Sequence, residues 1–419
     1  MSPIIKRLNQ LLVTKGDAVQ SWLDEEAAKA PPPITTSVDL RHSGERLVPV
    51  DTNLFPAGFN NISDPAKRRA TLAFKRAIRR DVPGAERVLL IPENHTRNQG
   101  YIANLAVLAR IMAEAGVELR LGRAIDGNEE DVTLEVQDDA PLTVHALERR
   151  GPRLCTKDGF EPDAIVLNND LSDGLPSLLR GLSQPVMPPP ELGWHSRMKS
   201  AHFAAYDQVA TAFAHAFDLD PWTIAAGWTR VDDVDFRTRQ NMAEVAAGVD
   251  GVIAHAKAKH GAYDLPYDPY AFVKADSGTY GMGVMSVQAG ADVEALNKKR
   301  RHSMGVIKGG VQNSHVVVQE GVPTADLIEG APAEPVIYMV DGRPIGGFYR
   351  VHRDKDAYAS LNAVGSAFAD MCEEVDPELE PTEFMDPTPC AFRVLGLVAR
   401  LAALAAGREA QEARAEEAA

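Results

Sequence analysis

The clearest alternation of apolar and polar segments lies in residues 86–122, which read ERVLLIPENHTRNQGYIANLAVLARIMAEAGVELRLG. An apolar run at 88–91 predicts a buried strand, and a polar loop follows it. Apolar residues at helical spacing then predict a helix of about eighteen residues ending near Gly116, and 117–121 predicts a second strand. A strand, a helix and a strand joined by short links are typical of a parallel sheet covered by helices.

The rest of the amino-terminal half predicts shorter elements. We expect two short helices before the prolines at 31–33, a helix at 64–80 and a further strand at 163–170. Residues 184–194, QPVMPPPELGW, contain consecutive prolines, which continue neither a helix nor a central strand. We interpret this segment as a linker or domain boundary.

The carboxyl-terminal half alternates strands and helices. Strands are expected at 270–275, 283–288, 315–321, 335–342 and 343–351, and helices at 196–216, 234–259, 291–303 and 390–406. The dipeptide Asp341-Gly342 indicates a hairpin turn between the last two strands. The charged, Ala/Glu-rich residues after the last helix are expected to be frayed.

Composition and charge narrow the classes of partner. The chain has 419 residues, and its 59 acidic and 44 basic side chains give a formal charge of −15. Such a charge disfavours nucleic acid or an anionic membrane as the main partner, so an anionic ligand must meet a local cluster of cations. Three cysteines without a CxxC pair predict neither a disulfide framework nor a zinc site. With no secretory signal and no long apolar run, we expect a cytoplasmic protein.

Residues 272–284, FVKADSGTYGMGV, form the most suggestive motif. Lys274 lies on an apolar strand directly before a glycine-rich run, whose glycines allow backbone N–H groups to approach a ligand. The spacing matches neither a P-loop nor a dinucleotide-binding fingerprint. On this segment alone, a phosphate-binding loop and an ordinary glycine-containing turn are equally good interpretations.

The order of the neighbouring segments changes that balance. A lysine after a proline-rich boundary, a strand lysine with a glycine-rich flap, then VQE and a hairpin leading to an arginine together resemble the ATP-grasp fold. More closely, nearly the whole chain resembles the glutamate–cysteine ligase family first described in iron-oxidising proteobacteria. The stretches that carry the resemblance are DTNLFPAGFNNI, IPENHTRN, LGWHSRMKSAHF and KADSGTYGMGV.

The resemblance implies a nucleotide site for ATP and Mg²⁺. It assigns the phosphates to Lys199 and Lys274, and the adenine and ribose to Gln319 and Glu320. The flap over the phosphates corresponds to 276–283, with Ser277, Gly278, Tyr280, Gly281 and Gly283 as its binding residues. Arg350 and Asn362 correspond to residues that face an acyl phosphate, so Lys274, Arg350 and Asn362 are the expected catalytic residues.

The match departs from the ATP-grasp pattern at the metal site. The usual carboxyl-terminal Asp followed by ExN has no counterpart in this sequence. The metal ligands are therefore unknown, and Glu320, Glu334 and Asp386 are only candidates.

Two polar clusters in the amino-terminal half are candidates for amino-acid binding. A glutamate substrate carries two carboxylates and an ammonium group, so its site needs cations, anions and amides together. Arg41, Asp51 and Asn53 supply this mixture around a Phe-Pro-Ala-Gly turn. Glu93, Asn94 and Arg97 supply it at the carboxyl end of the strand at 88–91, the edge where parallel sheets favour ligands.

We therefore expect an α/β protein of ATP-grasp type. Its expected parts are a mostly parallel substrate-binding domain at 1–190, a helical connector at 191–265 and an α+β nucleotide-binding module at 266–419. The resemblance implies ATP-dependent ligation of the glutamate γ-carboxylate to cysteine, the first step towards glutathione. Another ATP-grasp carboxylate–amine ligase and a non-catalytic nucleotide-binding protein are the alternatives. The residues alone decide neither the amino-acid specificity nor the oligomeric state.

Overall fold

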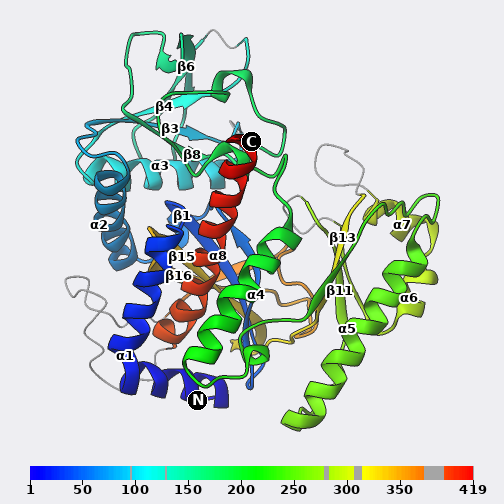
Figure 1. Ribbon diagram of the computed structural model, residues 1–419. Helices are drawn as coiled ribbons and strands as arrows, with labels where there is room; N and C mark the ends of the chain where they lie inside the picture. The colour runs from blue at the N-terminus through cyan, green and yellow to red at the C-terminus, as the bar shows by residue number, and fades with distance from the viewer. Residues whose placement is uncertain (95–96, 128–129, 278–282, 306–313, 372–390, 419) are drawn as a thin grey trace.

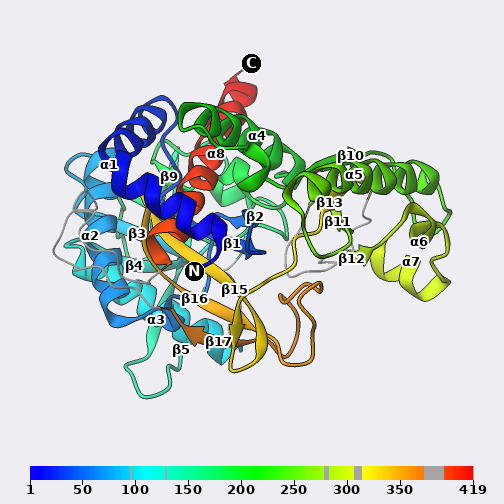
Figure 2. The same ribbon diagram turned by 90° about the horizontal axis from the view of Figure 1, so that it is seen from below.

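The computed structural model describes residues 1–94, 97–127, 130–277, 283–305, 314–371 and 391–418, and these form three β-sheets with helices packed on them (Figure 1). We call the sheets A, B and D. Sheet A lies in the middle of the molecule, sheet B at one end, and sheet D at the side (Figures 1 and 2). The mixed α/β class expected from the sequence is confirmed.

Sheet B contains the strand–helix–strand unit that the sequence predicts. β3 (Arg87–Pro92) leads through α3 (Gln99–Glu114) to β4 (Glu118–Arg123), and the two strands pair in parallel. Asn98 begins α3, because its side chain accepts a hydrogen bond from the Tyr101 backbone N–H. The sheet order is β5-β6-β4-β3-β8-β9, with β7 on β6. The other strands are β5 (Val132–Leu134), β6 (Leu142–Arg150), β7 (Arg153–Thr156), β8 (Ala164–Asn168) and β9 (Val186–Met187).

Sheet A joins the two ends of the chain. Its order is β17-β16-β15-β1-β2, with β14 on β15, and its pairs are antiparallel. The turn expected at Asp341-Gly342 connects β15 to β16, and both of its residues have positive φ, as a tight hairpin requires. The strands are β1 (Thr35–His42), β2 (Leu47–Asn53), β14 (Leu327–Ile328), β15 (Ala331–Val340), β16 (Arg343–Val351) and β17 (Ala367–Asp370).

Helices cover both faces of sheet A. α1 (Pro3–Lys29), α4 (Lys199–Ala216) and α8 (Phe392–Ala418) share one apolar core with the side chains of Val38, Leu40 and Ile337 (Figure 1). Lys15 interrupts the helical geometry of α1, so the two expected amino-terminal helices are joined at a kink. α2 (Asp64–Asp81) and α3 pack with Val336 and Phe348 in a second core.

Sheet D forms the smaller lobe in Figure 2. Its antiparallel order is β10-β13-β11-β12, and α5 (Met242–Tyr263) covers the face that carries Val273, Val316 and Val318. Its strands are β10 (Trp228–Val231), β11 (Ala271–Ala275), β12 (Val284–Val287) and β13 (Val316–Glu320). Because side chains alternate along a strand, Lys274 and Gln319 face away from α5.

Three sequence-based expectations were wrong. The helix expected at 291–303 is two short helices, α6 (Gly290–Glu294) and α7 (Lys298–Met304). The proline-rich segment is not only a linker, because β9 pairs with β8 at the edge of sheet B. The carboxyl-terminal tail is helical through residue 418, since buried side chains such as Glu409 fix it.

The sheets combine strands that lie far apart in the sequence. β1 and β2 pair within the same sheet as β15 and β16, although they come from opposite ends of the sequence. α4 packs on α8, whereas α5 packs on sheet D. The division into 1–190, 191–265 and 266–419 stays a prediction. Within the described residues, no helix combines the length and apolar character needed to cross a bilayer.

Two glycines, one in α8 and one in α5, allow a test of how closely α8 packs against its neighbours. A Cβ on Gly407 would lie 2.5 Å from the Ala30 carbonyl oxygen, whereas a Cβ on Gly251 in α5 would meet no atom within 4 Å. We expect Gly407→Ala to lower the free energy of unfolding by about 1–3 kcal/mol. Gly251→Ala should raise it by up to about 1 kcal/mol, because alanine favours the helix. Urea denaturation of both variants checks this, and equal effects would contradict the close approach.

Candidate functional site

A row of charged side chains lies on sheet A, on strands β1, β15 and β16. Along β1, Val38 and Leu40 enter the core under α8, so Asp39 and Arg41 point to the other face. Arg41 Nε lies 2.8 Å from Glu334 Oε2, and Arg350 Nη1 lies 2.7 Å from Asp39 Oδ2. Arg350 also contacts Glu334, its cross-strand partner. The expected residues Arg41 and Arg350 therefore meet through one glutamate.

The environment of this row opposes ionisation of one carboxyl group. Burial raises the pKa of Asp39, and the nearby Glu334 and Asp51 carboxylates raise it further, against the lowering effect of Arg350. The row thus holds two acidic groups and two arginines, with the Asp51 carboxylate of β2 nearby.

Two lysines, one from a helix and one from a strand of sheet D, converge beside this row. Lys199, the first residue of α4, places Nζ 2.7 Å from Asp51 Oδ1 on β2. Lys274 on β11 donates to Gln319 Oε1 at 2.6 Å and to the Val50 carbonyl oxygen at 3.2 Å. The sequence predicted both lysines and Gln319, and the structure brings them together with Asp51.

The two lysines and Asp51 shift one another's pKa values. Burial lowers the pKa of Lys274 to about 8, although Asp51 opposes the shift. Desolvation favours a higher pKa for Asp51, but Lys199 and Lys274 lower it to about 2. Asp51 is therefore ionised at neutral pH, and Lys274 loses its proton more readily than an ordinary lysine.

Asp276, the first residue of the expected flap, ties sheet D to α4. Its carboxylate accepts hydrogen bonds of 2.7 Å from the backbone N–H and the hydroxyl of Ser200. Arg230 lies 3.3 Å from the same carboxylate. A carboxylate at the amino-terminal end of a helix is favoured by the helix dipole. The base of the flap is thereby fixed next to Lys199.

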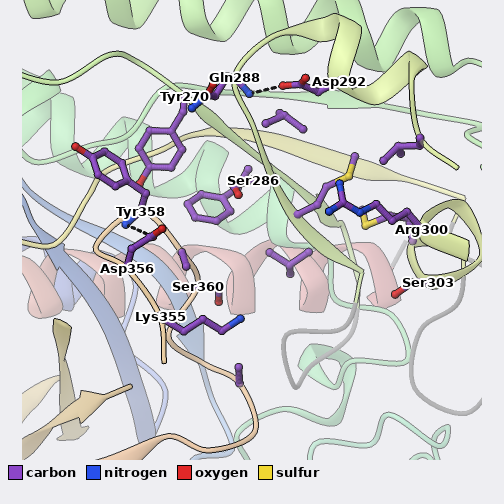
Figure 3. A pocket seen from close by; sticks show the side chains of 18 of the residues that line it. Tyr270, Ser286, Gln288, Asp292, Arg300, Ser303, Lys355, Asp356, Tyr358 and Ser360 are labelled. Carbon is purple, nitrogen blue, oxygen red and sulfur yellow. Dashed lines mark hydrogen bonds between the residues drawn. The ribbon is translucent and has the colours of Figure 1, made fainter. Parts of the chain in front are cut away.

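An aromatic row continues from Lys274 along β11. Tyr270, Phe272 and Lys274 are two residues apart, so their side chains point to the same face. The ring centres of Tyr270 and Phe272 lie 5.5 Å apart. A cavity of about 1090 Å³ lies beside these two rings. Its walls are β12, the segment that includes α6 and α7, and the segment 355–363. Tyr270 and Tyr358 line one side of it, and Arg300 and Ser303 the opposite side (Figure 3). Flat rings that lead to a cation can accept a base and its phosphates.

The cavity and the expected nucleotide residues adjoin rather than coincide. Its described lining includes Asn362 but not Lys199, Lys274, Gln319 or Glu320. It also includes Phe272 and Val284, and Val284 is the cross-strand partner of Lys274. Lys274 therefore lies at the margin of the open space.

The second amino-acid cluster lies where strands β3 and β8 end. Glu93 accepts a 2.6 Å hydrogen bond from the Asp170 backbone N–H, so the loops after the two strands are joined. Tyr101 Oη accepts from the Glu93 backbone N–H at 2.7 Å and lies 3.2 Å from the Asn168 carbonyl oxygen. Asn94 and Arg97 are exposed at the same edge.

Several predicted residues have other surroundings. Glu320 is buried and paired with Arg46, so its carboxylate already has partners. The Asn53 side chain accepts from the Phe55 backbone N–H in its own loop. Gly283 has a φ of +63°, and its carbonyl oxygen accepts from the Ala275 backbone N–H. Ser277 lies next to Asp276 at the base of the flap, while Gly278, Tyr280 and Gly281 lie outside the described residues.

Neither Glu320 nor Glu334 belongs to a group of metal-binding side chains within the described residues. No group of three or more His, Cys, Asp or Glu side chains among them is arranged to hold a metal ion. Glu320 and Glu334 are paired with arginines, and Asp386 lies outside the described part of the chain.

Sequence reasoning missed the support behind Lys199. Arg197 makes two contacts of 2.8 and 3.1 Å with Glu409 of α8 and donates to the Thr52 carbonyl oxygen at 2.7 Å. His202 also contacts the Glu409 carboxylate. No sequence signal pairs residues so far apart, whereas the spacing of Asp39 and Arg41 on one strand could have marked Asp39.

Comparisons with known proteins show the family of this chain. The family model of GshA, glutamate–cysteine ligase, matches residues 9–410. The chain is similar to the crystal structure of a "Putative gamma-glutamylcysteine synthetase" from Methylobacillus flagellatus KT, with a TM-score of 0.87 and 39% identity over 98% of this chain and 96% of that chain. No curated protein matches the sequence.

A second solved structure is far less similar. D-alanyl-alanine synthetase A from Vibrio cholerae O1 biovar eltor matches with a TM-score of 0.32 and 12% identity over 69% of this chain and 75% of that chain. Similarity at this level supports no argument about the fold or the site.

The Glu409 contacts predict a stability that depends on pH. Arg197 and His202 lower the pKa of Glu409 to about 2, although burial opposes the shift. The ionised carboxylate thus stabilises the fold above the ordinary glutamate pKa, and this stabilisation is lost as the pH falls towards 2. We expect Glu409→Gln to cost about 3–5 kcal/mol at pH 7. Urea unfolding at pH 7 and pH 3.5 should show a smaller difference at the lower pH, and a constant difference would contradict the assignment.

Proposed function

The chain belongs to the glutamate–cysteine ligase family and joins glutamate to cysteine, and we propose that it does so with ATP and Mg²⁺ between sheets A and D. One observation carries the proposal: Lys199 from the sheet-A layer and Lys274 from sheet D converge beside Asp51. They lie next to the charged row of Asp39, Arg41, Glu334 and Arg350. The product of this proposed reaction, γ-glutamylcysteine, serves glutathione biosynthesis.

The chemistry explains why cations gather here. A carboxylate is a poor electrophile, and ATP supplies the phosphoryl group that converts the glutamate γ-carboxylate into an acyl phosphate. Negative charge accumulates as the phosphoryl group moves and again as the cysteine amine attacks. Fixed positive groups stabilise that charge without reorganising. We assign the phosphates to Lys199 and Lys274 and the acyl group to the vicinity of Arg41 and Arg350.

The aromatic row and the cavity favour the nucleoside part of ATP. Tyr270 and Phe272 provide apolar surface, and the Tyr270 hydroxyl is buried with no hydrogen-bond partner among the described residues. Asn362 lines the same space from the segment 355–363. We assign the amino acids to sheet A and to the edge of sheet B with Glu93, Asn94 and Arg97. Mg²⁺ belongs with the phosphates, and none of the described carboxylates is assigned to it.

The direct test is phosphate release from Mg·ATP by the purified protein. Tubes contain glutamate alone, cysteine alone, both amino acids, or γ-glutamylcysteine with glycine. Release only with glutamate and cysteine together, with a matching dipeptide, supports the proposal. Release only with the last pair indicates a glutathione-synthetase-like ligase. ATP binding that raises the melting temperature, with no release in any tube, indicates the non-catalytic alternative.

The lowered pKa of Lys274 predicts that the affinity for ATP depends on pH. With a pKa of about 8, Lys274 is charged at pH 7 and becomes neutral as the pH rises. The dissociation constant of ATP, measured by calorimetry without amino acids, should therefore increase above pH 8. Lys274→Arg should remove this dependence, because a guanidinium keeps its charge. Lys274→Ala should lower turnover by about 10²–10³-fold, and near-normal turnover would remove the assignment.

Arg97 tests the amino-acid edge of sheet B. It is exposed, so Arg97→Ala should leave folding unchanged. If Arg97 meets a substrate carboxylate, the Michaelis constant of glutamate or cysteine should rise at least about tenfold, which corresponds to roughly 1.4 kcal/mol. The matched control is Arg79→Ala on α2, another exposed arginine, for which both constants should keep the wild-type values. Unchanged constants for Arg97→Ala as well would exclude this role.

A further inference from the structure

The chain connects sheet D to the rest of the molecule through two segments in its described part. Residues 217–227 lead from α4 to β10, and residues 321–326 lead from β13 to β14 of sheet A. Sheet D otherwise stands beside the larger body (Figure 2). The position of Lys274 relative to Lys199 and Asp51 therefore depends on how these two connections are held, together with the contact of Asp276 with Ser200.

One buried ion pair holds both of them. Arg46, in the turn between β1 and β2, is fully buried and donates to both carboxylate oxygens of Glu320 at 2.6 and 3.0 Å. Arg46 also donates to the carbonyl oxygens of Trp222 and Ala225, at 3.1 and 2.9 Å. Its guanidinium carbon lies 3.8 Å from the centre of the Trp222 ring.

The Glu320 carboxylate also has several hydrogen-bond partners. Its carboxylate accepts from Trp222 Nε1 at 3.1 Å and from the Gly227 backbone N–H at 3.0 Å, in addition to Arg46. Glu320 ends β13, where the second connection begins, while Trp222 and Gly227 belong to the first. Arg46, in a turn of sheet A, thus binds both connections at one point.

This point is adjacent to the proposed phosphate site. Gln319 precedes Glu320 on β13, is the cross-strand partner of Phe272, and accepts a hydrogen bond from Lys274. A shift of Glu320 would move Gln319, Phe272 and Lys274 together, because they share one sheet. Since a protein ion pair with several additional hydrogen bonds has a defined geometry, it can fix such a position.

We propose that Arg46 and Glu320 are positioning residues that set where sheet D stands over sheet A, and with it the distance between Lys274 and Lys199. Glu320 thus acts through the backbone and not by contact with the ribose. The inference rests on the proposed ATP site. It predicts that loss of the pair weakens ATP binding selectively, while the binding of amino acids to sheets A and B is preserved.

The test compares ATP binding by wild type, Glu320→Gln and Arg46→Lys, using calorimetry at pH 7. Glu320→Gln keeps the shape of the side chain but removes its charge. We expect the dissociation constant of ATP to rise by roughly 5- to 150-fold, the usual range for coupling between separate sites. Arg46→Lys should have a smaller but clear effect, because an ammonium cannot bridge Glu320 and two carbonyl oxygens with the same fork. The Michaelis constants of glutamate and cysteine should stay within about twofold.

A destabilised control separates positioning from loss of stability. Leu23→Ala removes a buried side chain of α1 and should lower the free energy of unfolding without changing ATP affinity. If Glu320→Gln and Leu23→Ala lower the melting temperature alike and neither changes ATP affinity, the positioning role is wrong. Equal weakening of ATP and amino-acid binding in Glu320→Gln would also overturn it. Absence of ATP binding in the wild type would instead refute the proposed function on which the inference depends. If the Glu320→Gln variant does not fold, Arg46→Lys decides by the same measurements.

Discussion

The need to pair buried charges connects the layers of this protein. Arg41, Arg46 and Arg197 are almost completely buried, and each meets a glutamate from an element far away in the sequence. An unpaired ion in such surroundings would cost several kcal/mol, whereas a pair with further hydrogen bonds is tolerated. The pairs join β1 to β15, the β1–β2 turn to β13, and the start of α4 to α8. The first pair ties two neighbouring strands of sheet A, the second fixes sheet D against sheet A, and the third joins two helices of one core.

The folding of distant segments against one another also explains how an acidic protein can present a positive site. The formal charge of −15 is spread over the chain, but Lys199 and Lys274 are gathered at one place by strands and a helix from two layers. Asp51 balances them without cancelling them, and burial makes Lys274 sensitive to nearby charge. An anionic ligand thus meets a local field that differs in sign from the average field of the molecule.

Patterns within short stretches of the sequence predicted much of the fold. The strand–helix–strand unit of sheet B, the tight hairpin at Asp341-Gly342 and the strand that carries Lys274 follow from periodicity and turn chemistry within short windows. The errors occurred where distant contacts decide the outcome. The tail after residue 406 remains helical because Glu409 and its apolar neighbours are buried, and the proline-rich segment gains a sheet partner in β8.

The sequence by itself determined the elements, the family resemblance and the residue types that phosphate and carboxylate chemistry requires, because these depend on composition and short-range order. Only the tertiary structure decided which of those residues meet. It brought Lys199, Lys274 and Gln319 together, joined Arg41 to Arg350 through Glu334, and enclosed Glu320 with Arg46. The physical reason is that each of these contacts links segments whose separation along the chain carries no periodic signal. Packing and charge pairing between layers select them, and neither is visible within a single window of sequence.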